Sequence, residues 1–77
     1  MRQHRYAIRR PRDRAWLRDL LTLRGDDGKR VIVGVTWTID HNQAIRYQSA
    51  KAARHVIAQL GEGDPLEVVN QRGRVIP

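Results

Sequence analysis

The stretch from Val31 to Leu60 changes its hydrophobic period midway, and this change constrains the fold more than any other feature. From Val31 to Ile39 the odd positions hold Val, Val, Val, Trp and Ile, and the even positions hold Ile, Gly, Thr and Thr. Period-two alternation of β-branched residues predicts a strand with one buried face, so Trp37 is expected in the core. Turn residues at 40–43 then interrupt the pattern.

A helical period follows from Ser49 onwards. The apolar residues that recur at spacings of three and four are Ala53, Val56, Ile57 and Leu60. Such residues share one face of a helix, which is therefore predicted from about Ala50 to Leu60. Ser49 is suited to the N-cap, and Gly61 is suited to the position just past the helix end.

Residues 15–24 fit two patterns, and the residues alone leave both open. Those with helical spacing are Trp16, Leu17, Leu20 and Leu21. Against a helix, Leu17, Leu21 and Leu23 share strand parity, and the sequence GDDG follows at 25–28. A Gly/Asp cluster between two apolar runs is a hairpin signal. We therefore prefer a strand at 15–24 that pairs with the strand at 31–39.

Shorter strands are expected near both ends of the chain. Residues 5–10 predict a strand that stops at Pro11, since proline cannot donate to a β-ladder. Residues 66–70 predict a last strand, and 75–77 a short edge piece. Together the elements predict an α+β fold: a mostly antiparallel sheet of four to five strands with one helix packed on one face. We expect a single domain over residues 1–77.

The small size of the chain bears on its stability and location. A core built from 77 residues without cysteine is modest, so a homodimer or another partner is one source of added stability. No apolar run approaches the roughly 18 residues of a membrane span. The basic N-terminus is followed by an apolar segment, 6–8, that is too short for a signal peptide. We expect a soluble, cytoplasmic protein.

The net charge of +7 is the main functional clue, and thirteen of the fifteen cations are arginine. Arginine holds phosphates and carboxylates in bidentate geometry, and a basic balance of this size favours a polyanionic partner. Nucleic acid, or a nucleoprotein complex, is such a partner, and an acidic protein surface is another. A genome rich in G and C would also explain the preference for arginine over lysine, but not the net charge.

The cations that stand out lie in three stretches of the sequence. These candidate partner-binding or nucleic-acid-binding residues are Arg9, Arg10, Arg12, Arg14, Lys29, Arg30, Arg72 and Arg74. Cation-rich hairpin tips and sheet edges are how sheet proteins approach a phosphate backbone. The four at 9–14 are expected to lie outside the apolar packing, and scattered surface charge explains the whole set equally well. Trp16 has arginines on both sides, so a cation–π contact is expected there as an alternative to simple packing.

Residues suited to catalysis or metal binding do not form a recognisable set. His4, His41 and His55 fall in different predicted elements without carboxylates at ligand spacing, so we expect neither a metal nor a cofactor. Nucleophile motifs and phosphate loops are absent from the sequence. A small basic protein can still cleave RNA with cations and groups such as Tyr47 and His41. We expect no enzymatic activity. An RNA-cleaving toxin is the third hypothesis, after the two binding functions given next.

The motifs at 35–40 (VTWTID), 44–49 (AIRYQS) and 52–53 (AA) resemble a recurrent pattern of small phage and mobile-element proteins. The resemblance covers roughly residues 28–60 and includes some anti-CRISPR inhibitors. It implies a non-catalytic protein that docks on a nucleoprotein complex, on nucleic acid, or on both. The sheet-then-helix order also resembles the DNA-binding arm domain of phage-type integrases, which is the alternative. Many anti-CRISPR proteins are acidic DNA mimics, and the basic charge of this chain argues against simple mimicry.

Overall fold

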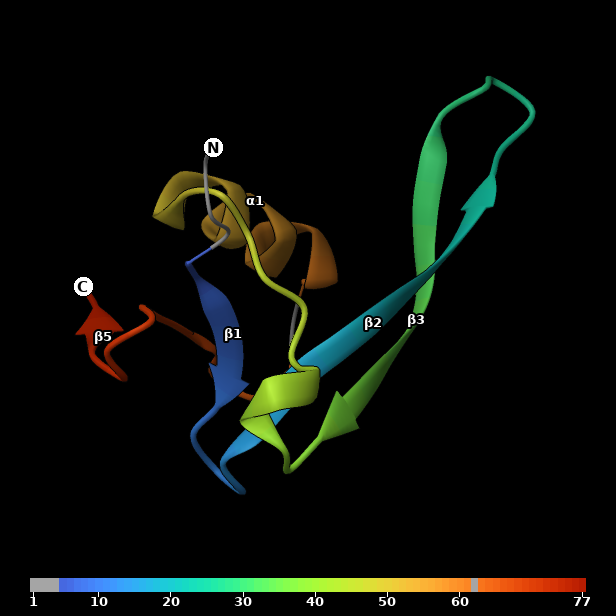
Figure 1. The fold of residues 1–77 in the computed structure, drawn as a ribbon. Coiled ribbons are helices and arrows are strands. Elements are labelled where there is room, and N and C mark those ends of the chain that lie inside the picture. Colours follow the sequence, from blue (N-terminus) through green and yellow to red (C-terminus); the bar gives the residue numbers. More distant parts are fainter. Residues whose placement is uncertain (1–4, 62) are drawn as a thin grey trace.

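The computed structural model describes residues 5–61 and 63–77. In this part of the chain, five antiparallel strands form one sheet in the order β3-β2-β1-β4-β5, and one α-helix lies against it (Figure 1). The elements are β1 (Ala7–Arg10), β2 (Ala15–Arg24), β3 (Arg30–Thr38), the short 3-10 helix η1 (His41–Gln43), α1 (Ala50–Leu60), β4 (Glu67–Val69) and β5 (Val75–Ile76). The predicted α+β fold with one helix is confirmed.

Residues 15–24, which fitted two patterns, form the strand β2. It pairs with β1 at Arg10↔Ala15 and Arg9↔Trp16, and with β3 from Trp16↔Thr38 to Arg24↔Arg30, with an irregularity at Arg18. The hairpin between β2 and β3 is closed by a hydrogen bond from the Gly25 N–H to the Lys29 carbonyl, at 2.8 Å.

The helix α1 has the predicted bounds because its caps function as the sequence indicates. The Ser49 hydroxyl accepts a hydrogen bond from the Ala52 N–H at 3.1 Å. Gly61 follows the last turn with φ of 73°, a conformation that costs glycine little. Ala53 is fully buried, so its small side chain lets the helix approach the sheet closely.

The core lies between α1 and one face of the sheet. Its buried members are Ile8, Leu17, Ala53 and Val68, from β1, β2, α1 and β4. Trp37 packs against this cluster but is only half-buried. The segment before α1 is attached to the sheet beside the start of β1, because the Tyr47 N–H donates a hydrogen bond to the Tyr6 carbonyl.

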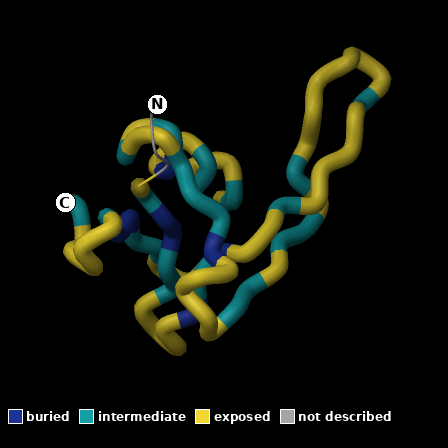
Figure 2. Tube along the Cα trace, viewed as in Figure 1, coloured by how far each residue is buried: buried dark blue, intermediate teal, exposed yellow. Residues whose placement is uncertain are grey.

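The predicted buried face of the strand at 31–39 is wrong at three positions. Ile39 lies just past the end of β3 and is 89% exposed. Within β3, Val31 and Val33 are 54% and 56% exposed, whereas Val35 and Trp37 are half-buried. One reason is that the β2–β3 hairpin extends past the core, where nothing in the described chain covers it (Figure 2). The other is a register irregularity between Leu21↔Gly34 and Thr22↔Ile32, which leaves Val33 unpaired and shifts the alternation.

Candidate nucleic-acid interface

The first group of candidate arginines sits where β1 turns into β2. Arg9 and Arg10 are the last residues of β1, and Pro11 ends its pairing. Arg14 has a φ of 57°, which closes the turn before β2. Arg12 and Arg14 are exposed. The turn therefore gathers four cations at one end of the sheet, as the sequence suggested.

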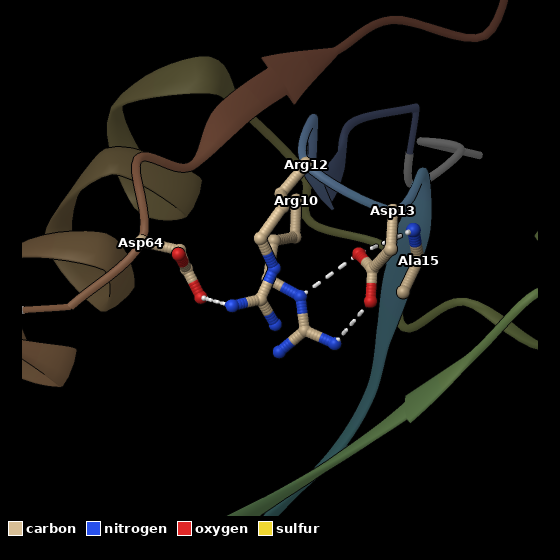
Figure 3. A network of polar contacts seen from close by, with 5 residues as sticks. All are labelled: Arg10, Arg12, Asp13, Ala15 and Asp64. Carbon is tan, nitrogen blue, oxygen red and sulfur yellow. Dashed lines mark hydrogen bonds and ion pairs between the residues drawn. The ribbon is translucent and has the colours of Figure 1, made fainter.

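Arg10 contacts Asp13 through hydrogen bonds (Figure 3) and also contacts the ring of Trp37. Its Nε and Nη2 donate to the two carboxylate oxygens of Asp13, at 2.9 and 2.7 Å. Its guanidinium also lies over the Trp37 ring, 4.3 Å from the centroid, and its side chain is only 18% exposed. The expectation that this arginine lies outside the packing is wrong, because planar guanidinium stacks well on an aromatic face.

The Arg10–Asp13 pair alters the titration of both groups. The hydrogen bonds from Arg10 lower the pKa of Asp13 from 3.8 to about 2, with help from the Ala15 N–H at 3.3 Å. The same hydrogen bond raises the pKa of Arg10. Hydrogen bonds to a charged carboxylate favour that form, so Asp13 stays ionised throughout the physiological range.

Two more arginines of this group face carboxylates from the other end of the chain. Arg12 pairs with Asp64 at 2.9 Å, which ties the β1–β2 turn to the loop after α1 (Figure 3). The Arg9 Nε donates to Glu67 on β4 at 2.6 Å. Arg9 also lies over Trp16, 5.4 Å from the ring centroid, so the cation–π contact that the sequence left as an alternative for Trp16 is present. Each pair reduces the charge left for an outside anion.

The second group lies at the tip of the β2–β3 hairpin. Lys29 precedes β3, and Arg30 is its first residue. The register sets Arg30 directly opposite Arg24, the last residue of β2. Like charges in this cross-strand position repel, so the pair costs stability when no anion is present. Arg24 was missed from the sequence, although it directly precedes the GDDG turn signal at 25–28 that Lys29 and Arg30 directly follow.

The tip also carries Asp26 and Asp27. The Asp27 Oδ1 accepts a hydrogen bond from the Lys29 N–H at 3.0 Å and so stabilises the turn itself. In the described chain, neither aspartate lies within ion-pairing distance of Arg24 or Arg30. The guanidinium groups of that pair are therefore exposed and open to another anion.

The third group flanks the turn between β4 and β5. The Asn70 Oδ1 accepts from the N–H groups of Arg72 and Arg74, at 2.9 and 3.0 Å. Gly73 between them has φ of 80°, and both arginines are exposed. These two hydrogen bonds close the turn, which lies at the far side of the sheet from β3 (Figure 1).

The residues considered for RNA cleavage differ in their exposure. The Tyr47 hydroxyl is buried and has no hydrogen-bond partner in the described chain, and burial, then the Asp19 charge, raise the pKa of Tyr47. His41 is exposed on η1, with its ring 6.4 Å from that of Trp16. His4 lies outside the described residues.

Two general features of the described residues complete the geometry. Residues 5–61 and 63–77 hold no group of three or more His, Asp or Glu side chains placed to bind a metal. Neither helix in these ranges is long and apolar enough to cross a membrane.

Comparisons with protein-family models, with curated proteins and with solved structures find no match to this chain.

Proposed function

We propose that this is a non-catalytic binding protein that contacts nucleic acid through the tip of the β2–β3 hairpin. The part of this hairpin from Leu21 to Val33 is called the arm. The observation that carries the proposal is the cross-strand pair Arg24–Arg30, which has no carboxylate partner in the described chain. A phosphate between the two guanidinium groups would replace their repulsion with charge-assisted hydrogen bonds.

The shape of the arm suits this role. It is a two-stranded ribbon that projects away from the helix and the rest of the sheet (Figure 1). A ribbon of this kind fits the major groove of B-DNA, which is about 12 Å wide. The arginines of the β1–β2 turn support the sheet instead, because Arg9, Arg10 and Arg12 are paired within the protein.

A narrower form of the proposal follows the resemblance to phage and mobile-element proteins. In it, the nucleic acid belongs to a nucleoprotein defence complex, and the protein inhibits the complex by docking on it. A net charge of +7 favours contact with the phosphates of such a complex over imitation of them. A DNA-binding module of the integrase-arm type would use the same ribbon on free duplex.

The test is a binding titration by fluorescence anisotropy, with a short labelled duplex and a labelled RNA, over a range of salt concentrations. Each phosphate contact contributes about −0.9 to the slope of log K against log salt on duplex DNA. We expect the Arg24→Ala/Arg30→Ala variant to bind more weakly. Its slope should be shallower by the contribution of about two phosphate contacts. The labelled RNA should remain intact throughout.

The matched control is Arg72→Ala/Arg74→Ala, which removes the same charge beside another exposed turn. It should keep most of the affinity and most of the slope. Equal losses in the two variants would mean that only net charge matters, and would overturn the assignment to the arm. RNA cleavage that disappears with Tyr47→Phe or His41→Ala would overturn the non-catalytic reading.

A further inference from the structure

The strand β3 forms one edge of the sheet and is paired on one side only. The order β3-β2-β1-β4-β5 leaves β3 and β5 as the two edges (Figure 1), and β3 has nine residues against two in β5. Within residues 5–61 and 63–77, no backbone–backbone hydrogen bond involves residues 31–37 except those of the ladder with β2. Every second residue of an antiparallel strand directs its N–H and C=O away from its partner, so these groups are open to another strand.

The half of β3 nearest the core lacks the features that protect a sheet edge. Edges in natural proteins are commonly protected by proline, by charge or by a β-bulge. In β3 the charge of Arg30 and the irregularity at Val33 both lie in the half that belongs to the arm. Residues 34–38 (GVTWT), which we call the free edge, contain neither proline nor charge. The irregularity at Arg18 lies on β2, so the free edge itself is continuous.

A pocket of about 190 Å³ lies beside the free edge, on the face of the sheet that α1 covers. Val35 and Trp37 of the free edge line this pocket and also pack against the core cluster. Leu60 at the end of α1 and Leu66 before β4 supply its other apolar walls. A cavity of roughly 150 Å³ holds a molecule the size of benzene, so this pocket suits one aliphatic or aromatic side chain.

The charged groups that line the pocket are already paired within the protein. Arg10 donates two hydrogen bonds to Asp13, and Asp64 is ion-paired with Arg12. Neither group needs a charged ligand, so the pocket favours an apolar side chain. Outside the pocket, the net charge of +7 favours acidic residues in a partner.

We propose that the free edge binds an extended segment of a partner protein, which adds a strand beside β3 and inserts one apolar side chain into the pocket. In this mode of recognition, main-chain hydrogen bonds supply affinity, and a pocket for alternate side chains supplies specificity. Side chains of the added strand that lie opposite Val35 and Trp37 project onto the face of the pocket. The side chain opposite Thr36 projects onto the other face. The recognised segment therefore has one apolar anchor, with acidic residues favoured outside it.

The same geometry argues against other occupants of the free edge. A second copy that paired through its own β3 would bring only Val35 and Trp37 to this face, and both already line the pocket of their own chain. Nucleic acid has no row of alternating N–H and C=O groups to match the edge. A small apolar molecule would fill the pocket but would leave the edge unpaired.

The probe for the test is a displayed library of random seven-residue peptides, selected against the full chain. We expect the enriched peptides to share one apolar residue at a fixed position. A labelled peptide of the consensus sequence should then bind in a fluorescence anisotropy titration. On binding, hydrogen exchange of alternate backbone amides within residues 34–38 should slow by about tenfold or more, because they gain a partner.

A scan of N-methylated peptides tests the added strand itself. A methyl group on an amide that bonds to β3 removes one hydrogen bond and should weaken binding, whereas a methyl group on the next amide should be tolerated. The losses should therefore alternate along the peptide. Equal tolerance at every position would overturn pairing with the edge.

Two matched variants test the pocket. Leu66→Phe extends a wall into the cavity and should weaken binding of the peptide by about tenfold or more, because its anchor no longer fits. Leu23→Phe makes the same change at a position that is 63% exposed on the arm, and should bind as the wild type does. Far-UV circular dichroism checks that both variants fold, and the methylation scan needs neither of them.

The Arg24→Ala/Arg30→Ala variant separates this proposal from that for nucleic acid. It should bind the consensus peptide normally, since the free edge lies outside the tip of the arm. Loss of peptide binding in this variant would assign the peptide to the tip instead. A library that yields no consensus, or equal losses in Leu66→Phe and Leu23→Phe, would also overturn the proposal. So would a dimer of the wild type in which the amides of residues 34–38 are already protected without peptide.

Discussion

Single arginines in this protein act in different ways, according to what lies beside them. The Arg10 guanidinium is hydrogen-bonded to the Asp13 carboxylate and lies over the Trp37 ring, so its charge is already paired within the fold. Arg24 and Arg30 face each other across the ladder, and no carboxylate of the described residues pairs with either. The residue type is the same, but only the second arrangement becomes more stable when an anion binds.

A titration of Asp13 tests the first arrangement. Its carboxyl should titrate near pH 2 in the folded protein, well below its ordinary value of 3.8, because Arg10 donates two hydrogen bonds to it. A lowered folded-state pKa stabilises the fold above the ordinary value, and this contribution is lost as the pH falls from about 3.8 through about 2. Carboxyl NMR measures it directly.

Two variants sharpen that titration. Arg10→Ala should return the Asp13 pKa towards 3.8, whereas Arg72→Ala, at the far β4–β5 turn, should leave it unchanged. A wild-type carboxyl that titrates at its ordinary value would contradict the Arg10–Asp13 geometry.

Among the elements, β2 belongs to two different environments. Its first half, with Leu17 fully buried, is part of the core. Its second half, with Leu23 63% exposed, belongs to the arm. One ten-residue strand therefore supports the fold at one end and presents a surface at the other.

This division predicts unequal costs for the same substitution. Leu17→Ala should lower the free energy of unfolding by about 2–5 kcal/mol, since it leaves a cavity in a small core. Leu23→Ala should cost less than about 0.5 kcal/mol, as is usual at exposed positions. Urea unfolding would measure both. Equal costs would mean that the arm packs against something in the free protein.

The elements themselves could largely be predicted from the sequence, because they depend on local patterns. The bounds of α1 follow from Ser49, Gly61 and the apolar spacing between them, and the hairpin follows from its Gly/Asp turn. The exposure of Val31 and Val33 could not be predicted in this way. Alternation identifies the two faces of a strand, but it does not say where the core ends, and an unpaired residue such as Val33 shifts its phase.

Across the whole molecule, the candidate cations are divided among three places. The β1–β2 turn, the tip of the arm and the β4–β5 turn lie apart from one another (Figure 1). The sequence predicted which residues are basic and that they gather at turns. It could not predict which of them are paired, because a contact such as Arg9–Glu67 joins residues 58 positions apart.

The central claim is that nucleic acid binds at the tip of the arm, and an NMR titration of the labelled protein with the duplex tests it most directly. The account predicts that shift changes concentrate on the backbone of residues 24–30 and on the side chains of Arg24 and Arg30. Residues of the β4–β5 turn should change little. Changes centred instead on Arg72 and Arg74, or on the turn at 9–14, with the arm unaffected, would contradict it.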